Sequence, residues 1–268
     1  YACGADWQCL KGVNDAHTID MIAGLPEARG VTAELHSAQW YQEVAANLDA
    51  RHVGIDPETG FRTIGGYWNL LSAAAGLLNI ITITGLGKII VTSPGKREVR
   101  GLIWVDMVWP WVIAYDLWNL AYVYNCLADR AWYSGVALLA SCTIPALMKF
   151  GRGAWIQYRA YTLTLWSGVV LTFPHFMHDS MFAHRSAHNP WAMLILSAAA
   201  LVANAWVFVA HVRTIISKRR NPFTQEVHAD EATYASWVRD LASEEDKELI
   251  AARLGTTPEK AGFTSVSE

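Results

Sequence analysis

The sequence contains few charged residues. Only 17% of its 268 residues are Asp, Glu, Lys or Arg, whereas 53% are hydrophobic; a soluble domain usually has about a quarter of its residues charged. The apolar residues also gather in long runs instead of recurring with amphipathic spacing, which is typical of a polytopic membrane protein. The formal net charge of -3 argues against a nucleic acid or another polyanion as the partner.

Motifs of several enzyme classes are missing as well. The chain has no Walker motif, no GxSxG or HExxH motif and no Ser/His/Asp pattern. Its four cysteines show no CxxC or Cys/His finger spacing, so we expect no structural zinc. The last apolar run contains no lysine, which argues against a retinal Schiff base. The cofactor, if the protein has one, stays unknown from the sequence.

Five apolar runs are long enough to be transmembrane helices, since about 20 residues cross a hydrocarbon core of ~30 Å. The predicted spans cover residues 67–91, 102–127, 132–148, 155–176 and 191–216. The predicted fold class is therefore an all-α, polytopic membrane bundle surrounded by lipid.

Two polar regions flank this bundle. Residues 1–66 form an N-terminal region in which an amphipathic helix is predicted from about Thr32 to Leu48. Residues 217–268 form an acidic, partly helical tail, with a helical pattern from Asp230 to Leu254. We expect this tail to be a solvated helix that ends in disorder.

Basic residues are distributed unevenly between the predicted loops. The loops after the second and fourth spans contain two of them, Arg130 and Arg185. The loops after the first, third and fifth spans contain ten, which are Lys96, Arg97, Arg100, Lys149, Arg152, Arg159, Arg213, Lys218, Arg219 and Arg220. The positive-inside rule then places the C-terminus in the cytoplasm and residues 1–66 outside.

An outside N-terminus has two consequences. Its translocation requires a cleaved signal or further spans before Tyr1, and we expect one of the two. Cys3 and Cys9 would lie in an oxidising compartment, so we expect them to form a disulfide.

The second predicted span is polar for a membrane segment. It contains Pro110, which we expect to kink the helix. At 3.6 residues per turn, one side of this helix is an aromatic stripe. The stripe consists of Trp104, Trp111, Tyr115, Trp118 and Tyr122. Polar residues surround much of the remaining surface, so we expect a central helix that is packed on several sides.

These polar residues define a predicted intramembrane site. Its members are Asp116, Asn119, Tyr115, Asp106 and Asn125. An ionisable group in a span costs at least ~2.5 kcal/mol on insertion scales, and Asp116 lies near the middle. It is interpreted as a proton-relay carboxylate, a cation ligand or a counter-ion, and the alternative is a structural Asp hydrogen-bonded inside the bundle. Asp106 lies nearer the cytoplasmic end, within reach of Lys88.

A second polar cluster follows the fourth span. His175 and His178 are three residues apart with Asp179 adjacent, a spacing that can bind a metal ion. The alternative is a hydrated, histidine-rich loop. His211, in the fifth span, is interpreted as an interfacial anchor.

Three sequence blocks resemble one family. They are YDLWNLAYVYNC at 115–126, SCTIPA at 141–146 and SAHNP at 186–190. They are similar to a family of bacterial polytopic membrane proteins of unknown function, and the resemblance covers about Gly65 to Pro222. It implies additional spans upstream and a location in the bacterial inner membrane, and it implies no activity.

Three functions are consistent with these observations. The first is small-solute or ion/proton-coupled transport through the Asp116 site. The second is an accessory subunit of a larger membrane complex, or a homo-oligomer, that packs through the tryptophan-rich helix. The third is a metal-dependent membrane enzyme that uses the histidine cluster. An enzyme is the less favoured class.

Overall fold

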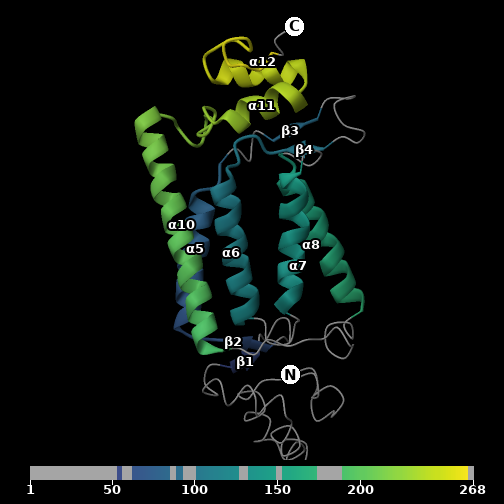
Figure 1. Ribbon diagram of the computed structural model, residues 1–268, viewed down its shortest axis with the longest axis vertical. Helices are drawn as coiled ribbons and strands as arrows, with labels where there is room; N and C mark the ends of the chain where they lie inside the picture. The colour runs from purple at the N-terminus through teal and green to yellow at the C-terminus, as the bar shows by residue number, and fades with distance from the viewer. Residues whose placement is uncertain are drawn as a thin grey trace, which may run out of the picture. The chain divides into compact units, whose positions relative to one another are not determined.

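The described part of the chain is mostly helical, which confirms the helical class (Figure 1). The computed structural model describes residues 53–55, 62–84, 89–92, 101–126, 132–148, 153–173 and 189–264. Helices in these ranges are α5 (Tyr67–Ile81), α6 (Trp109–Cys126), α7 (Trp132–Leu147), α8 (Trp155–Thr172), α10 (Pro190–Lys218), α11 (Ala232–Leu241) and α12 (Glu244–Arg253). Two antiparallel strand pairs accompany them, β1 (Val53–Ile55) with β2 (Arg62–Ile64) and β3 (Ile90–Val91) with β4 (Leu102–Ile103).

Contacts divide the chain into two compact units. The first consists of Tyr1–Gly76, Asp116–Ala137 and Ser167–Val202, and the second of Leu77–Tyr115, Leu138–Trp166 and Ala203–Glu268. Each of the five long helices contributes residues to both units.

The first two predicted spans are wrong in their bounds. The first was expected to cover 67–91, but α5 ends at Ile81 and residues 90–91 form β3. The second was expected to cover 102–127, but residues 102–103 form β4 and α6 begins at Trp109. Ile90 pairs with Ile103, and Thr92 N–H donates to the Gly101 carbonyl at 2.8 Å. A short apolar run rich in β-branched residues suits a strand as well as a helix, and pairing decided for the strand.

Pro110 therefore lies in the first turn of α6 and not in its middle. Proline is tolerated there because the first N–H groups of a helix have no intrahelical partner. The predicted kink between Asp106 and Asp116 is wrong, because Asp106 precedes the helix.

The other three spans agree more closely with the prediction. α7 spans 132–147, α8 spans 155–172 and α10 spans 190–218. The Asn189 side chain accepts N–H groups of Trp191 and Ala192 at 2.9 and 3.3 Å, so it caps α10 ahead of Pro190. Among the described residues α10 alone is long and apolar enough to cross a membrane, and Tyr67–Ile81 and Tyr133–Leu147 are shorter apolar helices.

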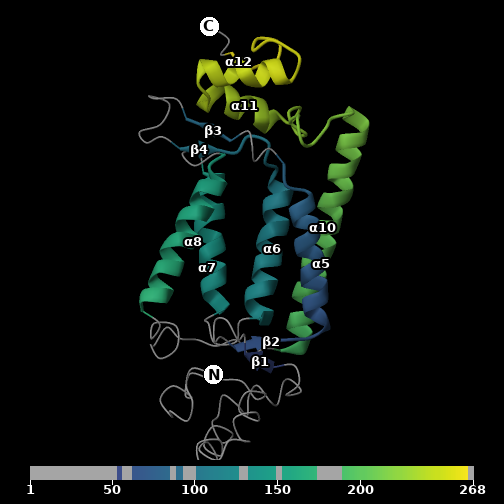
Figure 2. The same ribbon diagram turned by 180° about the vertical axis from the view of Figure 1, so that it is seen from behind.

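The expectation of a solvated tail is also wrong. α11 and α12 bury Tyr234, Trp237 and Ile250, which belong to the same apolar core as Trp104 of the second unit. In Figure 1 and Figure 2, α11 lies beside the β3–β4 pair and α12 lies beside α11. Gly153, at a φ of 75°, makes this packing possible. An added Cβ there would lie 2.7 Å from Ile103 Cγ2 and 3.3 Å from Trp237 Cε3.

Helices α5 and α10 contact each other through matched polar pairs. In the first unit, Ser72 Oγ lies 3.1 Å from Ser197 Oγ. In the second unit, Asn79 Nδ2 donates to Asn204 Oδ1 at 3.0 Å. Both pairs are 125 residues apart, so the two helices keep one parallel register. Small and polar residues at such an interface let two helices approach closely and hydrogen-bond to each other.

Candidate functional site

Asp106 of the second unit binds the backbone of the tail. Its side chain is 1% exposed. Oδ1 accepts the N–H of His228 at 2.8 Å, and Oδ2 accepts the N–H of Val227 at 3.1 Å. Hydrogen bonds to a carboxylate are roughly twice as strong as neutral ones. Asp106 therefore fixes the segment between α10 and α11 against the turn that leads into α6.

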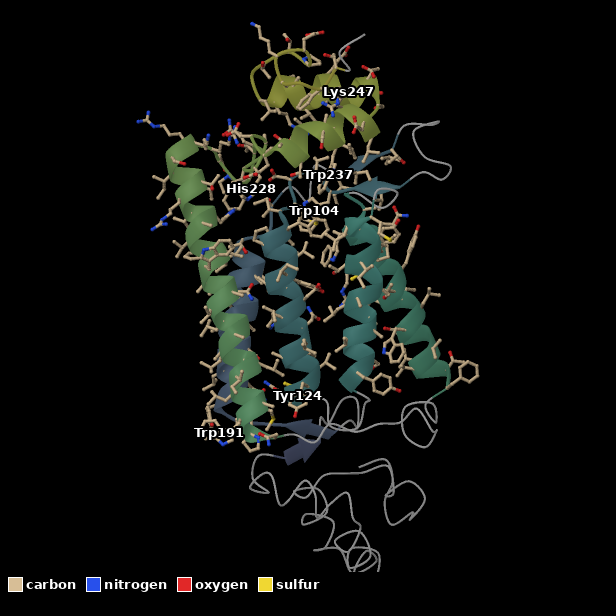
Figure 3. All side chains as sticks on the ribbon, in the orientation of Figure 1. Trp104, Tyr124, Trp191, His228, Trp237 and Lys247 are labelled. Carbon is tan, nitrogen blue, oxygen red and sulfur yellow. The ribbon has the colours of Figure 1, made fainter. Side chains whose placement is uncertain are left out.

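A cavity of about 350 Å³ adjoins Asp106 within the second unit. Its walls come from the end of α5, the β4–α6 turn, α10 and the start of the tail. They consist of Thr82, Thr84, Trp104, Asp106, Met107, Val108, Trp109, Pro110, Trp111, Trp206, Val207, Ala210, His211, Thr214, His228, Glu231 and Thr233. In Figure 3, Trp104, His228 and Trp237 gather where α6 begins. This volume is at the lower end of the range of ligand pockets, about 300 to 1,000 Å³.

Two histidines of the cavity wall lie close to each other. The rings of His211 and His228 have centroids 5.7 Å apart. His211 is 5% exposed, and its buried Nδ1 has no hydrogen-bond partner among the described residues. Burial lowers the pKa of His228, the nearby Arg220 lowers it further, and Glu231 partly offsets both. His228 is therefore a neutral imidazole at pH 7.

Two of the four tryptophans that line the cavity are held by their indole N–H groups. Trp104 Nε1 donates to the Thr84 carbonyl at 2.7 Å, and Trp111 Nε1 donates to the Asn79 carbonyl at 3.1 Å. Their rings meet edge to face at 5.2 Å, and Trp155 joins them at 6.2 and 5.8 Å. Such aromatic pairs contribute about 0.5 to 1.5 kcal/mol beyond their buried area. The ring faces are thus fixed in place around the cavity.

The predicted polar site is distributed over both units. Asp106 and Tyr115 belong to the second unit, whereas Asp116, Asn119 and Asn125 belong to the first. Tyr115 accepts the Arg159 Nε–H at 3.1 Å. Asp116 and Asn119 are half-buried, and an intramembrane site centred on Asp116 stays a prediction.

Asn125 has a defined place within the first unit. Its side chain is fully buried, and its Nδ2 donates to Ser197 Oγ at 2.6 Å and to the Met193 carbonyl at 3.3 Å. These bonds connect α6 with α10, so Asn125 contributes to helix packing.

The predicted aromatic stripe does not lie on one helix throughout, because α6 begins only at Trp109. Trp104 lies before the helix, yet its ring contacts Trp111, which stacks on Tyr115 at 5.4 Å. In the first unit, Trp118 packs against Gly76, where a Cβ would lie 2.9 Å from the indole. Tyr122 is 46% exposed.

The remaining predicted sites fall outside the described residues. These are the proposed metal ligands His175, His178 and Asp179, the proposed disulfide between Cys3 and Cys9, and the amphipathic helix at 32–48. Within the described ranges, no group of three or more His, Cys, Asp or Glu side chains could hold a metal ion. The two cysteines in these ranges, Cys126 and Cys142, are free thiols.

Several site residues were missed from the sequence or misinterpreted. His211 was expected to be an interfacial anchor, but it is buried in the cavity wall. His228 and Asn204 were not singled out. A signal was present, because Ser197, Asn204 and His211 are spaced by seven residues along α10 and all three are buried. Polar residues that recur on a helical face every two turns indicate a packed face and not a lipid-facing one.

Comparison with known proteins identifies a family and no activity. No curated protein and no solved structure matches the chain. The model of one family, described as a "Family of unknown function (DUF5692)", matches residues 36–240. This range extends beyond the expected 65–222 and includes all five long helices, the cavity and most of α11. The chain therefore belongs to the family of unknown function DUF5692.

Proposed function

We propose that this chain is a five-span protein of the bacterial inner membrane, with residues 1–66 outside and the tail in the cytoplasm. The spans are α5, α6, α7, α8 and α10. The length of α10 supports one of these crossings, since 29 residues at ~1.5 Å each exceed a hydrocarbon core of ~30 Å. The loop charges support the orientation.

Large apolar side chains on the outer faces of these helices also support membrane insertion. On α10 five such residues outside the cavity lining are at least 44% exposed, namely Trp191, Ile195, Val202, Val209 and Ile216. On α5 four are at least 59% exposed, namely Leu70, Leu77, Ile80 and Ile81. Water disfavours contiguous apolar faces of this kind, whereas lipid accommodates them. α5 has only 15 residues, so it requires local thinning of the bilayer.

The function supported best is binding of a small solute in the cavity, coupled to proton movement as in a transporter. One observation carries this proposal. The buried Asp106 and His211 line a cavity of ligand size together with His228. Ionisable groups within a span, such as His211 in α10, are costly and mark solute paths or proton relays, and histidine is the side chain that changes charge near neutral pH.

Solute-induced charge movement in proteoliposomes tests the proposal. The full chain is exposed to concentration jumps of an amine, a carboxylate, an amino acid and a sugar on a supported membrane, and the displaced charge is recorded. We expect a current with at least one class, and we expect His211→Gln to reduce it about tenfold, since one buried hydrogen-bonding group is changed.

Asp116→Asn is the control for this experiment, because Asp116 belongs to the first unit. Its current should match that of the unchanged chain. If Asp116→Asn abolishes the current and His211→Gln leaves it intact, the solute site lies at Asp116 and the cavity is not the transport site.

A further inference from the structure

The hydrogen-bonding chemistry of the cavity identifies a class of ligand. Three lining threonines donate their hydroxyl hydrogens to backbone carbonyls: Thr82 to Leu78 at 2.9 Å, Thr84 to Asp106 at 3.2 Å and Thr214 to Ala210 at 2.9 Å. The indole N–H groups of Trp104 and Trp111 are engaged in the same way. A hydroxyl has one hydrogen and two lone pairs. These five side chains therefore have no hydrogen left for a ligand, and the hydroxyls still have lone pairs.

The charge of the lining has one sign. Asp106 and Glu231 contribute two carboxylates, and no lysine or arginine of the described ranges lines the cavity. An anionic ligand would be repelled and would lack a cationic partner in this wall. A positive charge close to two carboxylates is favoured, and more strongly where water is partly excluded.

His211 adds an acceptor inside the wall. The residue is only 5% exposed, and its Nδ1 has no hydrogen-bond partner among the described residues. A buried nitrogen left without a hydrogen bond costs about 1 to 3 kcal/mol. A ligand that brings an N–H group would remove this cost if the ring turned Nδ1 toward the cavity and carried its own proton on Nε2, because Nδ1 is itself buried. A quaternary ammonium has no such hydrogen.

The aromatic walls favour the same ligand. Trp109 and Trp206 line the cavity with rings that are partly or largely exposed, whereas Trp104 and Trp111 are 1% and 5% exposed and form the packed wall behind them. A cation within about 6 Å of a tryptophan ring is attracted by about 0.5 to 2 kcal/mol. We infer that the cavity binds a small protonated amine, which donates N–H to His211 and the threonine hydroxyls and places its charge among Asp106, Glu231 and the indoles. This inference rests on the proposed solute site and names its substrate class.

Calorimetric titration of the purified full chain in detergent tests the inference. The probes are n-butylammonium, tetramethylammonium, n-butanol and butyrate, which have similar size and differ in charge and donors. We expect n-butylammonium to bind at least tenfold more tightly than butanol or butyrate and more tightly than tetramethylammonium. His211→Leu should weaken n-butylammonium binding roughly 3- to 10-fold, the effect of one lost hydrogen bond.

Glu231→Gln provides a second variant, since Glu231 is exposed and its substitution should not disturb folding. It should weaken n-butylammonium binding severalfold, whereas Glu248→Gln, at an exposed position of α12 outside the lining, should not. If butanol or butyrate binds as tightly as the amine in a His211-dependent manner, the amine class is overturned and the solute site stands. If no probe binds, both the amine class and the solute site are overturned.

Discussion

At the residue scale, the attachment of the tail depends on groups that gather around Asp106. Its carboxylate accepts the N–H groups of Val227 and His228, and Arg220 donates to the Val227 carbonyl at 3.0 Å and to Asp230 at 2.7 Å. Backbone groups of this segment are thus bound on both sides by side chains. Asp106 and His228 line the cavity and also belong to the attachment of the tail. A change in the charge of either residue therefore affects both the cavity and the attachment.

Protonation of His228 should loosen this attachment. Its folded-state pKa is lowered by burial and by Arg220, with Glu231 opposing, so the neutral ring is preferred in the folded protein. The resulting stability is complete above the unfolded pKa of about 6.5 and is lost as the pH falls through the folded pKa. As the pH falls from 7.5 to 5.5, we expect hydrogen-exchange protection of the Val227 and His228 amides to fall, by at most about tenfold per pH unit below the unfolded pKa of His228.

His228→Gln is the matched control, because glutamine has a similar size and does not titrate. In this variant the protection of the Val227 amide should change little between pH 7.5 and 5.5. Asp230 does not interfere, since its hydrogen bond with Arg220 lowers its pKa and moves its titration below this range. Equal protection at both pH values in the unchanged chain would show that His228 is not coupled to the tail.

At the scale of elements, α5 and α10 contact each other at positions that recur with a regular spacing. Buried positions on α5 fall at Trp68, Ser72, Ala75, Asn79 and Thr82, just beyond its end. Those on α10 lie 125 residues later, at Met193, Ser197, Ala200, Asn204 and Val207. This alternation of three and four residues is the pattern of helices that pack side by side along their length. Ser72 and Ser197 hydrogen-bond to each other, as do Asn79 and Asn204, which satisfies these polar groups inside the protein.

The Asn79–Asn204 pair should stabilise this contact measurably. Asn79→Ala leaves the Asn204 Oδ1 without this donor, and Asn204→Ala also removes the bond to the Ala114 carbonyl. In a double-mutant cycle, measured by reversible unfolding in mixed micelles, we expect a coupling of about 0.6 to 1.7 kcal/mol. Ile80 lies next to Asn79 and is 63% exposed, so a cycle of Asn204→Ala with Ile80→Ala should give no coupling. Equal coupling in the two cycles would contradict this arrangement.

The sequence predicted the helix ranges well where no residue near a helix end pairs with a distant segment of the chain. α7, α8 and α10 stand alone as apolar runs between polar loops, and their ranges agree within a few residues. The first two spans fail at the ends that approach each other, because Ile90 and Ile103 pair across the chain and no local pattern records that partner. Asp106 was misplaced for the same reason. The buried face of α10 could be predicted from the seven-residue spacing of its polar residues. The cavity could not, because part of its wall comes from the tail, which is distant in the sequence.

At the scale of the whole molecule, two independent features bear on the proposed five-span topology. One is the distribution of basic residues, and the other is the apolar surface of the helices. Lysines and arginines in the connecting loops or in the helix ends beside them number ten and two on alternate sides. The helices contribute exposed apolar faces, which the loop charges do not influence. Insertion of a helix depends on its hydrophobicity, while its direction depends on flanking charge. The proposed topology is therefore tested most severely at a weakly apolar helix such as α8.

Reporter insertions at each loop test this five-span topology. We expect a fluorescent protein that folds only in the cytoplasm to be active after residues 98, 150 and 222, and alkaline phosphatase, which needs the oxidising side, to be active after residues 130 and 188. The physical reason is the cost of translocating the basic loops. Cytoplasmic fluorescence after residue 188, with the sites after residues 98, 130 and 150 unchanged, would show that α8 does not cross. In that case α10 would also have to enter from the opposite side, and its C-terminus and the tail would no longer be cytoplasmic. Fluorescence after residue 222 therefore provides the internal check, because an even number of crossings cannot give it together with an outside N-terminus.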